Sequence, residues 1–349
     1  MLTILFFLSS GIFLGWSLGA NDAANVFGTA VASRMIKFST AAVICSIFVI
    51  IGAVASGAGA SATLGELGSV NTLAGAFTVA MSAAFTVLIM TRATLPVSTS
   101  QAIVGAIIGW NFFAGIETDV AVFSKIVSTW IICPVLAMIF AMLMFFFAKT
   151  YVGHSRLHLF RQDSRTRIGL IVVGAFGSYS LGANNIANVM GVFVTSSPFK
   201  NFSIDGFVSF SGAQQLFLIG GIAIAVGVFT YSRKVMETVG NDIFTLSPIS
   251  ALIVVASASI VLFLFASKEL HDLLLAYNLP TIPLVPVSSS QAVVGAVIGI
   301  GLAKGGRNLH LETLGRISFG WLLTPIISAV ISFISLYFMQ NVFMNKVHL

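Results

Sequence analysis

One carboxylate and several amide side chains interrupt an apolar stretch near the start of the chain. Residues 17–28 read Ser-Leu-Gly-Ala-Asn-Asp-Ala-Ala-Asn-Val-Phe-Gly, in which Asn21, Asp22 and Asn25 are polar. In hydrocarbon, a polar group without a hydrogen-bond partner costs several kcal/mol. An ionisable side chain inside such a stretch therefore indicates a functional site.

The same polar pattern returns in the second half of the chain. Residues 180–191 read Ser-Leu-Gly-Ala-Asn-Asn-Ile-Ala-Asn-Val-Met-Gly and match the first stretch at nine of twelve positions. A second pair of segments, 96–109 and 286–299, begins Pro-Val-Ser-Thr-Ser-Gln and Pro-Val-Ser-Ser-Ser-Gln and is identical at eleven of fourteen positions. The chain is therefore predicted to be a duplicated unit with one pair of polar motifs in each half.

The composition is that of a membrane protein with many spans. The 349 residues are 57% hydrophobic and 8% charged, with a mean hydropathy of +1.03, whereas soluble domains have about 25% charged residues. The net charge of +6 comes from cations between apolar runs, as the positive-inside bias predicts, and not from a basic stripe with interleaved aromatic residues. We expect a multi-pass protein of a prokaryotic-type plasma membrane, surrounded by lipid and without a nucleic-acid partner.

The elements that position the motifs are predicted to be helices. The fold class is an all-α polytopic membrane protein with two inverted repeats and broken or re-entrant helices, in ten to twelve spans including half-spans. Around Asn21-Asp22 two alternatives stay open, a single broken helix or a hairpin that turns there. Pro96 is predicted to begin a short helix, because proline suits a first helical turn. About fourteen apolar residues follow Ser98, which suits a half-membrane helix.

The chain divides into three predicted parts. Residues 1–150 form a first transmembrane repeat, 151–167 a basic cytoplasmic linker and 168–349 a second transmembrane repeat. The first residues are interpreted as a membrane segment and not as a signal peptide, because they lack a positively charged start. The two motifs of a half are 77 residues apart in the first half and 104 in the second. This difference predicts an insertion of 27 residues, around 268–284.

The two motif pairs resemble those of a known family. Gly19-Ala-Asn-Asp22 with Asn25, its copy Gly182-Ala-Asn-Asn185 with Asn188, and the two Pro-Val-Ser segments are similar to the motifs of the inorganic phosphate transporter (PiT) family. The resemblance covers essentially the whole chain. It implies an inverted-repeat membrane protein, a homodimer, that takes up phosphate with sodium ions or protons; some members carry sulfate.

Physical chemistry supports an anion site at these motifs. A half-helix N-terminus presents free N–H groups and the positive end of the helix dipole, and hydroxyl and amide side chains add further donors. Two such ends facing each other would surround a tetrahedral oxyanion without a buried lysine or arginine. The expected anion ligands are Asp22, Asn25, Ser98, Thr99, Ser100, Gln101, Asn188, Ser288, Ser289, Ser290 and Gln291.

The same motifs offer hard oxygen atoms that suit a small cation. The expected sodium ligands are Asn21, Asp22, Asn184, Asn185, Ser98 and Ser288. Sodium would serve as the coupling ion, and no other cofactor is expected.

Asp22 is also expected to select the anion. Phosphate near neutral pH carries a proton that it can donate to a carboxylate, whereas sulfate is fully ionised and meets a like charge. The chain departs from the family pattern at Asn185, where the family usually has a second acid, and at Gln101 and Gln291, where it usually has histidine. These differences favour sodium over proton coupling.

The predicted function is import of inorganic phosphate with sodium by alternating access. A sulfate permease of the same family and a proton-coupled phosphate symporter are the alternatives. An anion channel explains the half-helices but needs no cluster of cation ligands. An enzyme is not expected, because the sequence contains no nucleophile elbow, phosphate-loop lysine motif or metal-binding His/Cys cluster.

Overall fold

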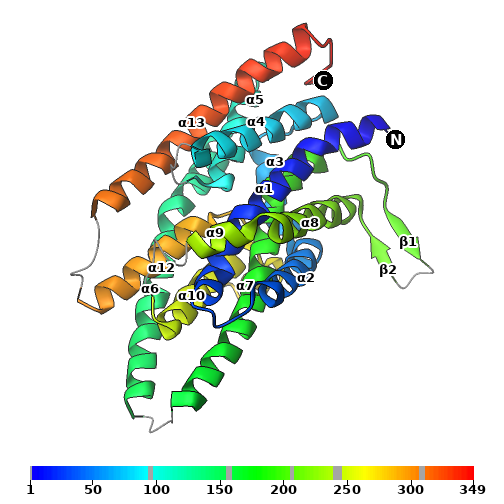
Figure 1. Cartoon of the computed structure of the whole chain (residues 1–349). Coiled ribbons are helices and arrows are strands. Elements are labelled where there is room, and N and C mark those ends of the chain that lie inside the picture. The colour runs from blue at the N-terminus through cyan, green and yellow to red at the C-terminus, as the bar shows by residue number, and fades with distance from the viewer. Residues whose placement is uncertain (1, 93–96, 155–158, 205–207, 239–245, 306–310) are drawn as a thin grey trace.

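The computed structural model describes residues 2–349 except 93–96, 155–158, 205–207, 239–245 and 306–310. The described residues form long helices and one short β-hairpin (Figure 1). In chain order the elements are α1 (Leu2–Ala32), α2 (Phe38–Ser56), α3 (Ala58–Leu67), α4 (Leu73–Arg92), α5 (Thr99–Ala114), α6 (Val120–His154), α7 (Leu159–Val194), β1 (Phe202–Ile204), β2 (Val208–Phe210), α8 (Gly212–Thr230), α9 (Ser232–Thr238), α10 (Pro248–Ala266), α11 (Lys268–Ala276), α12 (Ser289–Ala303) and α13 (Leu311–Asn341).

Within the described residues, eight helices are long and apolar enough to cross a membrane. They are α1, α2, α4, α6, α7, α8, α10 and α13. The helices α5 and α12 have 16 and 15 residues and rise about 24 Å or less, which is short of a hydrocarbon core about 30 Å thick. Eight spans and two half-length helices make ten, within the predicted range, and the chain is a multi-pass membrane protein.

The two halves of the chain make matching contacts with each other. Where α1 packs against α8, α7 packs against α2, and where α5 packs against α13, α12 packs against α6. Glycine lies where helices approach most closely: a Cβ on Gly19 would overlap the carbonyl oxygen of Ile224, and a Cβ on Gly182 would overlap that of Val49. These paired contacts are those expected of a duplicated unit, and each half completes its packing with helices of the other half.

The two motif-bearing helices, α1 and α7, pack against each other in opposite directions. Gly11, early in α1, lies against Phe193 near the end of α7, whereas Val26, late in α1, lies against Gly177 in the middle of α7. Antiparallel copies of one unit are what an inverted repeat requires. The orientation of the two copies in a membrane stays a prediction.

The predicted break at Asn21-Asp22 is wrong, and so is the alternative of a hairpin there. Helix α1 runs without interruption from Leu2 to Ala32, and its counterpart α7 also runs through its motif. Asn21 donates from Nδ2 to the carbonyl oxygen of Ser17, one turn earlier, at 2.9 Å. Because this polar side chain is satisfied within the helix, the backbone has no need to unwind.

Half-length helices form at both predicted segments, but α5 begins three residues after Pro96, its predicted first residue. Helix α5 begins at Thr99 after the N-cap residue Ser98, and α12 begins at Ser289 after the N-cap residue Ser288. A serine side chain at the N-cap position accepts a hydrogen bond from the first turn and so fixes the start of a helix. Pro96, the predicted first residue of the earlier element, lies outside the described residues.

The extra length of the second half is divided between two places. The connection from α1 to α2 covers residues 33–37, whereas its counterpart from α7 to α8 covers 195–211 and contains the antiparallel β1–β2 hairpin. The connection before α5 covers 93–98, whereas the one before α12 covers 267–288 and contains α11. The insertion predicted around 268–284 is therefore one of two.

Helices occupy most of the predicted linker 151–167. Helix α6 ends at His154 and α7 begins at Leu159, and the four residues between them lie outside the described part of the chain. Arg167 and Asp163, both exposed on α7, lie 4.0 Å apart.

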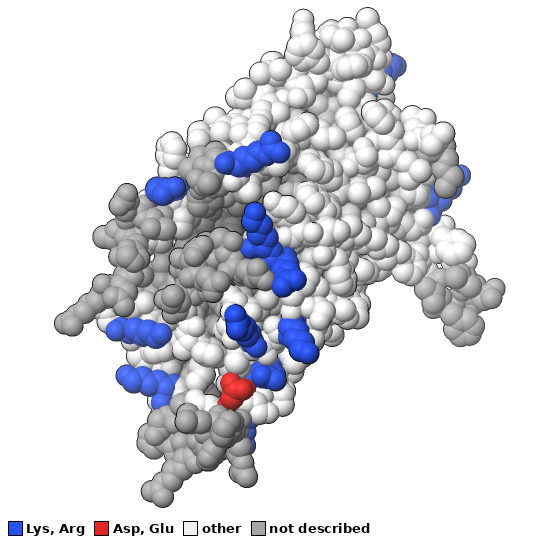
Figure 2. All heavy atoms as spheres, viewed as in Figure 1, with Lys and Arg blue, Asp and Glu red and all other residues white. Residues whose placement is uncertain are grey.

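Lysine and arginine side chains gather on one face of the molecule (Figure 2). Arg34, Lys37 and Arg233 line one pocket, and Lys304 at the end of α12 donates to Ser250 at the start of α10. We call the part of the molecule that carries these four cations the basic end. The positive-inside rule predicts that the basic end faces the cytoplasm.

Candidate functional site

The motif of the first half meets the half-length helix of the second half. Ser289, the first residue of α12, donates from Oγ to Oδ2 of Asp22 at 2.8 Å. Asn25, one turn further along α1, donates from Nδ2 to the same Ser289 oxygen at 3.2 Å. A carboxylate, a hydroxyl and an amide from opposite halves of the chain thus form one hydrogen-bonded cluster, which we call the Asp22 cluster.

The motif of the second half meets the half-length helix of the first half in the same way. Asn188 on α7 donates from Nδ2 to Oγ of Ser100 at 2.8 Å and to Oδ1 of Asn185 at 3.0 Å. The Ser100 hydroxyl in turn donates to the carbonyl oxygen of Val287 at 3.1 Å. Each polar motif is therefore joined to the half-length helix of the other half, and not to the one in its own half.

Asn184 holds the extended segment that leads into α12. Its Nδ2 donates to the carbonyl oxygen of Val285 at 3.3 Å, and its Oδ1 accepts from the backbone N–H of Val287 at 3.0 Å. Both the nitrogen and the oxygen of this fully buried amide make hydrogen bonds, so Asn184 positions the start of α12. The backbone of Val285 and Val287 is part of the site that sequence reasoning missed, because a backbone carbonyl has no residue-type signal.

The cap residues and Asn21 contribute in other ways. The hydroxyl groups of Ser98 and Ser288 accept from the backbone N–H groups of Gln101 and Gln291 at 3.4 and 3.3 Å. Ser290 and Ser288 share a hydrogen bond between their hydroxyl groups at 3.0 Å, and Thr99 is buried in the first turn of α5. Asn21 donates to the carbonyl oxygen of Ser17 in its own helix, and among the described residues it makes no hydrogen bond to the Asp22 cluster.

Four buried amide atoms near these clusters have no hydrogen-bond partner among the described residues. They are Oε1 of Gln101, Oε1 of Gln291, Nδ2 of Asn185 and Oδ1 of Asn188. Their residues are at most 2% exposed. A buried polar atom without a partner costs about 1–3 kcal/mol, so four such atoms on the helices that carry the polar motifs indicate a ligand site.

The two motifs differ in burial. Asn184, Asn185 and Asn188 are buried, whereas Asn21, Asp22 and Asn25 are half-buried. The half-buried residues Asp22, Asn25, Thr29 and Ala32 follow one another at helical spacing, so they lie along one face of α1. This face runs from the Asp22 cluster toward the basic end, where Ala32 lines the pocket that contains Arg34.

The ligand atoms available at the site are oxygens and amides. Among the described residues, no three or more His, Cys, Asp or Glu side chains come together as a metal group. The carboxylate of Asp22 is accompanied by hydroxyl, amide and backbone carbonyl groups. Hard cations are bound by oxygen ligands of these kinds.

Fold and site together define a class of protein. Two copies of a helical unit cross the membrane many times, and their polar motifs meet in the interior around one carboxylate. Discontinuous or half-length helices from two repeats that meet at a polar centre are typical of secondary transporters.

The chain belongs to the phosphate transporter family, whose model matches residues 18–167, 158–332 and 273–348. A relative from Methanocaldococcus jannaschii, named "putative phosphate permease", is 28% identical over 324 residues, which cover 92% of this chain and 93% of the relative. The sulfate permease CysP of Bacillus subtilis is 27% identical over 334 residues, covering 93% of this chain and 84% of the relative. The family is one of transporters.

A solved structure described as "the sodium-dependent phosphate transporter" has the same fold. It superposes with a TM-score of 0.78 and covers 97% of this chain and 99% of that chain, at 24% sequence identity. The predicted family and the predicted all-helical polytopic fold are confirmed.

Proposed function

We propose that this protein imports inorganic phosphate together with sodium ions by alternating access. The observation that carries the proposal is the Asp22 cluster, in which the carboxylate of α1 and the first residue of α12 are 2.8 Å apart. Membership of the phosphate transporter family and the shared fold with a sodium-dependent phosphate transporter support it.

Phosphate would bind between the starts of the two half-length helices. The first turns of α5 and α12 supply backbone N–H groups and a positive dipole, and the hydroxyl groups of Ser100 and Ser289 lie in those turns. A protonated phosphate oxygen could donate to Asp22, whereas sulfate has no proton to donate. This difference favours phosphate.

Sodium would bind to the oxygen atoms that lack a partner. The partnerless atoms of Gln101, Gln291 and Asn188 are oxygens, which act as cation ligands and not as donors to an anion. We therefore assign Gln101 and Gln291 to sodium, although the sequence alone favoured an anion role for them. A sodium ion beside Asp22 lowers the cost of burying both charges, so cation and anion binding depend on each other.

The difference in burial between the two motifs supports alternating access. The polar residues of the first motif are half-buried, on a face of α1 that runs toward the basic end, whereas those of the second motif are buried. Because α1 and α7 run in opposite directions, exchanging the conformations of the two halves would close the first motif and open the second toward the opposite end. Transport would then need no ATP, and the sodium gradient would drive it.

Sulfate transport is the second candidate function, and one residue favours it. Asn185 supplies an amide with a partnerless N–H group where the second acid is expected, and this group can donate a hydrogen bond to a fully ionised anion. The sulfate permease among the relatives also covers most of the chain.

Uptake into proteoliposomes tests the proposal. Radiolabelled phosphate and sulfate are supplied separately, each with an inward sodium gradient, an inward proton gradient or neither. Phosphate uptake that requires sodium and resists a tenfold excess of sulfate supports the proposal. Sulfate uptake supports the second candidate, proton-driven uptake supports a proton symporter, and flux without dependence on either gradient identifies a channel.

Two further proposals concern the assembly. We expect the protein to lie in the plasma membrane with its basic end in the cytoplasm, and to form a homodimer. Light scattering of the purified protein, corrected for bound detergent, measures the mass of the polypeptide directly. A value near twice 36.8 kDa supports the dimer, and a value near 36.8 kDa contradicts it.

A further inference from the structure

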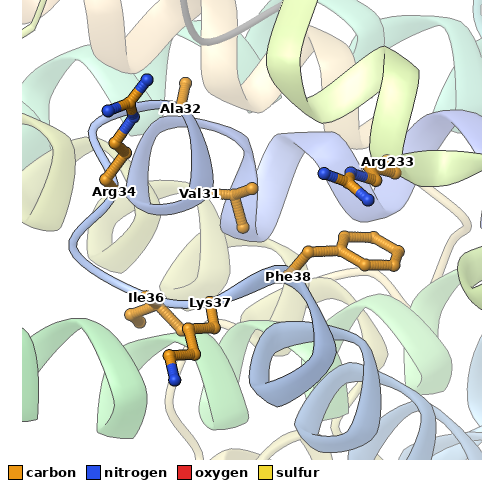
Figure 3. A pocket seen from close by; sticks show the side chains of 7 residues that line it. All are labelled: Val31, Ala32, Arg34, Ile36, Lys37, Phe38 and Arg233. Carbon is orange, nitrogen blue, oxygen red and sulfur yellow. The ribbon is translucent and has the colours of Figure 1, made fainter.

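The pocket lined by Arg34, Lys37 and Arg233 lies at the basic end, away from the Asp22 cluster. Along α1, nine residues separate Asp22 from Val31, which corresponds to a rise of about 14 Å. The pocket has a volume of about 570 Å³, and we call it the basic pocket (Figure 3). Its lining residues are Val31, Ala32, Arg34, Ile36, Lys37, Phe38 and Arg233.

The charged lining residues of the basic pocket are all cations. Arg34 and Lys37 belong to the connection between α1 and α2, and Arg233 extends from α9 on the other side of the pocket (Figure 3). The guanidinium carbon of Arg233 lies 5.9 Å from the centre of the Phe38 ring, a cation–π contact that helps to orient it. Arginine in such a setting is suited to phosphate, because its planar group donates two parallel hydrogen bonds.

The start of α2 adds backbone donors to the same pocket. The N-cap residue of α2 is Lys37, which has extended backbone angles and makes no side-chain cap hydrogen bond. The corresponding helix of the second half, α8, has a complete capping box formed by Ser211 and Gln214. Helix α2 therefore begins with first-turn N–H groups that its own N-cap side chain does not satisfy, and this end of a helix attracts anions.

Size and surroundings narrow the class of ligand. The volume lies within the range of about 300–1,000 Å³ that is typical of small-molecule sites. Val31 and Ile36, which are 9% and 5% exposed, give the pocket an apolar part, which we call its apolar floor. The half-buried face of α1 that begins at Asp22 ends at this pocket with Ala32.

We propose that the basic pocket binds a phosphate group, carried by inorganic phosphate or by the headgroup of an anionic phospholipid. Arg34, Lys37 and Arg233 neutralise the phosphate oxygens, and the start of α2 donates backbone N–H groups to them. The apolar floor accommodates the glycerol part of a lipid headgroup. The pocket is separate from the Asp22 cluster, and its binding requires no sodium.

Binding in sodium-free potassium buffer tests this proposal apart from the proposed transport function. The purified full-length protein in neutral detergent is incubated with radiolabelled inorganic phosphate, with short-chain phosphatidylglycerol, or with short-chain phosphatidylcholine as the neutral control. The test variant is R34Q/R233Q. Its matched control, R165Q/R167Q, removes the same charge from exposed positions on α7 that do not line the pocket. Equilibrium dialysis measures phosphate binding, and native mass spectrometry counts bound lipid.

We expect at least one anionic probe to bind the parent and R165Q/R167Q equally, and to bind R34Q/R233Q at least tenfold more weakly. Phosphate binding identifies the free anion as the ligand, and binding of phosphatidylglycerol alone identifies the lipid headgroup. The proposal is overturned if neither probe binds the parent, or if R34Q/R233Q binds like its control. If R34Q/R233Q does not fold, Lys37→Gln serves as the second test variant. We expect it to bind the anionic probe at least threefold more weakly than the parent does.

Discussion

Asp22 is a carboxylate on a membrane-crossing helix, and its hydrogen-bond partner comes from the other half of the chain. Ser289 is 267 residues away in the sequence and connects Asp22 with Asn25. On the opposite helix, Asn188 and Ser100 make the corresponding connection without a carboxylate. The site is therefore nearly symmetric in position but asymmetric in charge, and the single negative charge should control cation binding.

Asp22→Asn tests the role of this negative charge, because asparagine has nearly the same size and shape as aspartate but is neutral. Removing one member of a buried charged pair costs about 3–5 kcal/mol, so we expect sodium-driven phosphate uptake to fall roughly 100-fold or more. Asp163→Asn, on an exposed part of α7, removes the same charge elsewhere and should leave uptake unchanged. Initial rates in proteoliposomes at several sodium concentrations measure the effect. Sodium-dependent uptake at the parent rate in Asp22→Asn would rule out the assignment.

Ser289→Ala tests the hydroxyl between the two halves. Its loss leaves Asp22 and Asn25 without their shared partner, at a cost of about 1–3 kcal/mol. We expect phosphate binding in the presence of sodium to weaken roughly 5- to 150-fold. The control is Ser128→Ala, because the exposed Ser128 hydroxyl donates only within its own helix. Equal phosphate affinity in the two variants would show that Ser289 has no part in the site.

At the scale of elements, close helix crossings position the site. Gly19 and Gly182 belong to the two polar motifs, and each allows its helix to touch the backbone of a helix from the other half. Each half-length helix uses glycine in the same way: Gly105 of α5 faces the backbone of Pro325 in α13, and Gly295 of α12 faces that of Pro134 in α6. Small residues at helix crossings are typical of membrane proteins, because they let backbones approach closely.

Gly19→Ala and Gly182→Ala are each expected to destabilise the protein. The added Cβ would overlap a backbone carbonyl oxygen, and forcing extra atoms into a packed interior costs about 1–3 kcal/mol. Gly65→Ala on α3 is the control, because a Cβ there meets no atom within 4 Å and alanine favours a helix. Thermal unfolding in detergent should give a midpoint several degrees below the parent for the first two variants. A midpoint like that of Gly65→Ala would mean that the helices separate without cost.

At the scale of the whole molecule, the charges divide the protein into two ends. Glu117 lies in the connection before α6, and Arg165 lies near the start of α7, so the length of α6 separates them. The gathering of lysine and arginine at the basic end predicts which end is cytoplasmic (Figure 2).

Cysteine labelling on intact cells tests this orientation. The native Cys45 and Cys133 are buried and should give little background. We expect a membrane-impermeant maleimide to label Glu117→Cys in intact cells, and to label Arg165→Cys only after the cells are made permeable. The reverse pattern would place the basic end outside the cell and contradict the proposed direction of import.

The sequence by itself determined the duplication, the polar motifs, the half-length helices and the family. These features depend on residue types at fixed spacing. An apolar run of a given length predicts a span, and about fourteen apolar residues after Ser98 predict a half-membrane helix. For such features the physical cause is local, so the sequence was sufficient.

The tertiary structure decided how these parts are joined. Helix α1 is continuous, because Asn21 donates to a carbonyl oxygen one turn earlier. Asn184 accepts from the backbone N–H of Val287 and so holds the segment before α12. The tertiary structure also paired each motif with the half-length helix of the other half. Hydrogen bonds between residues 88 to 267 positions apart depend on the packing of helices, and local spacing carries no information about that packing.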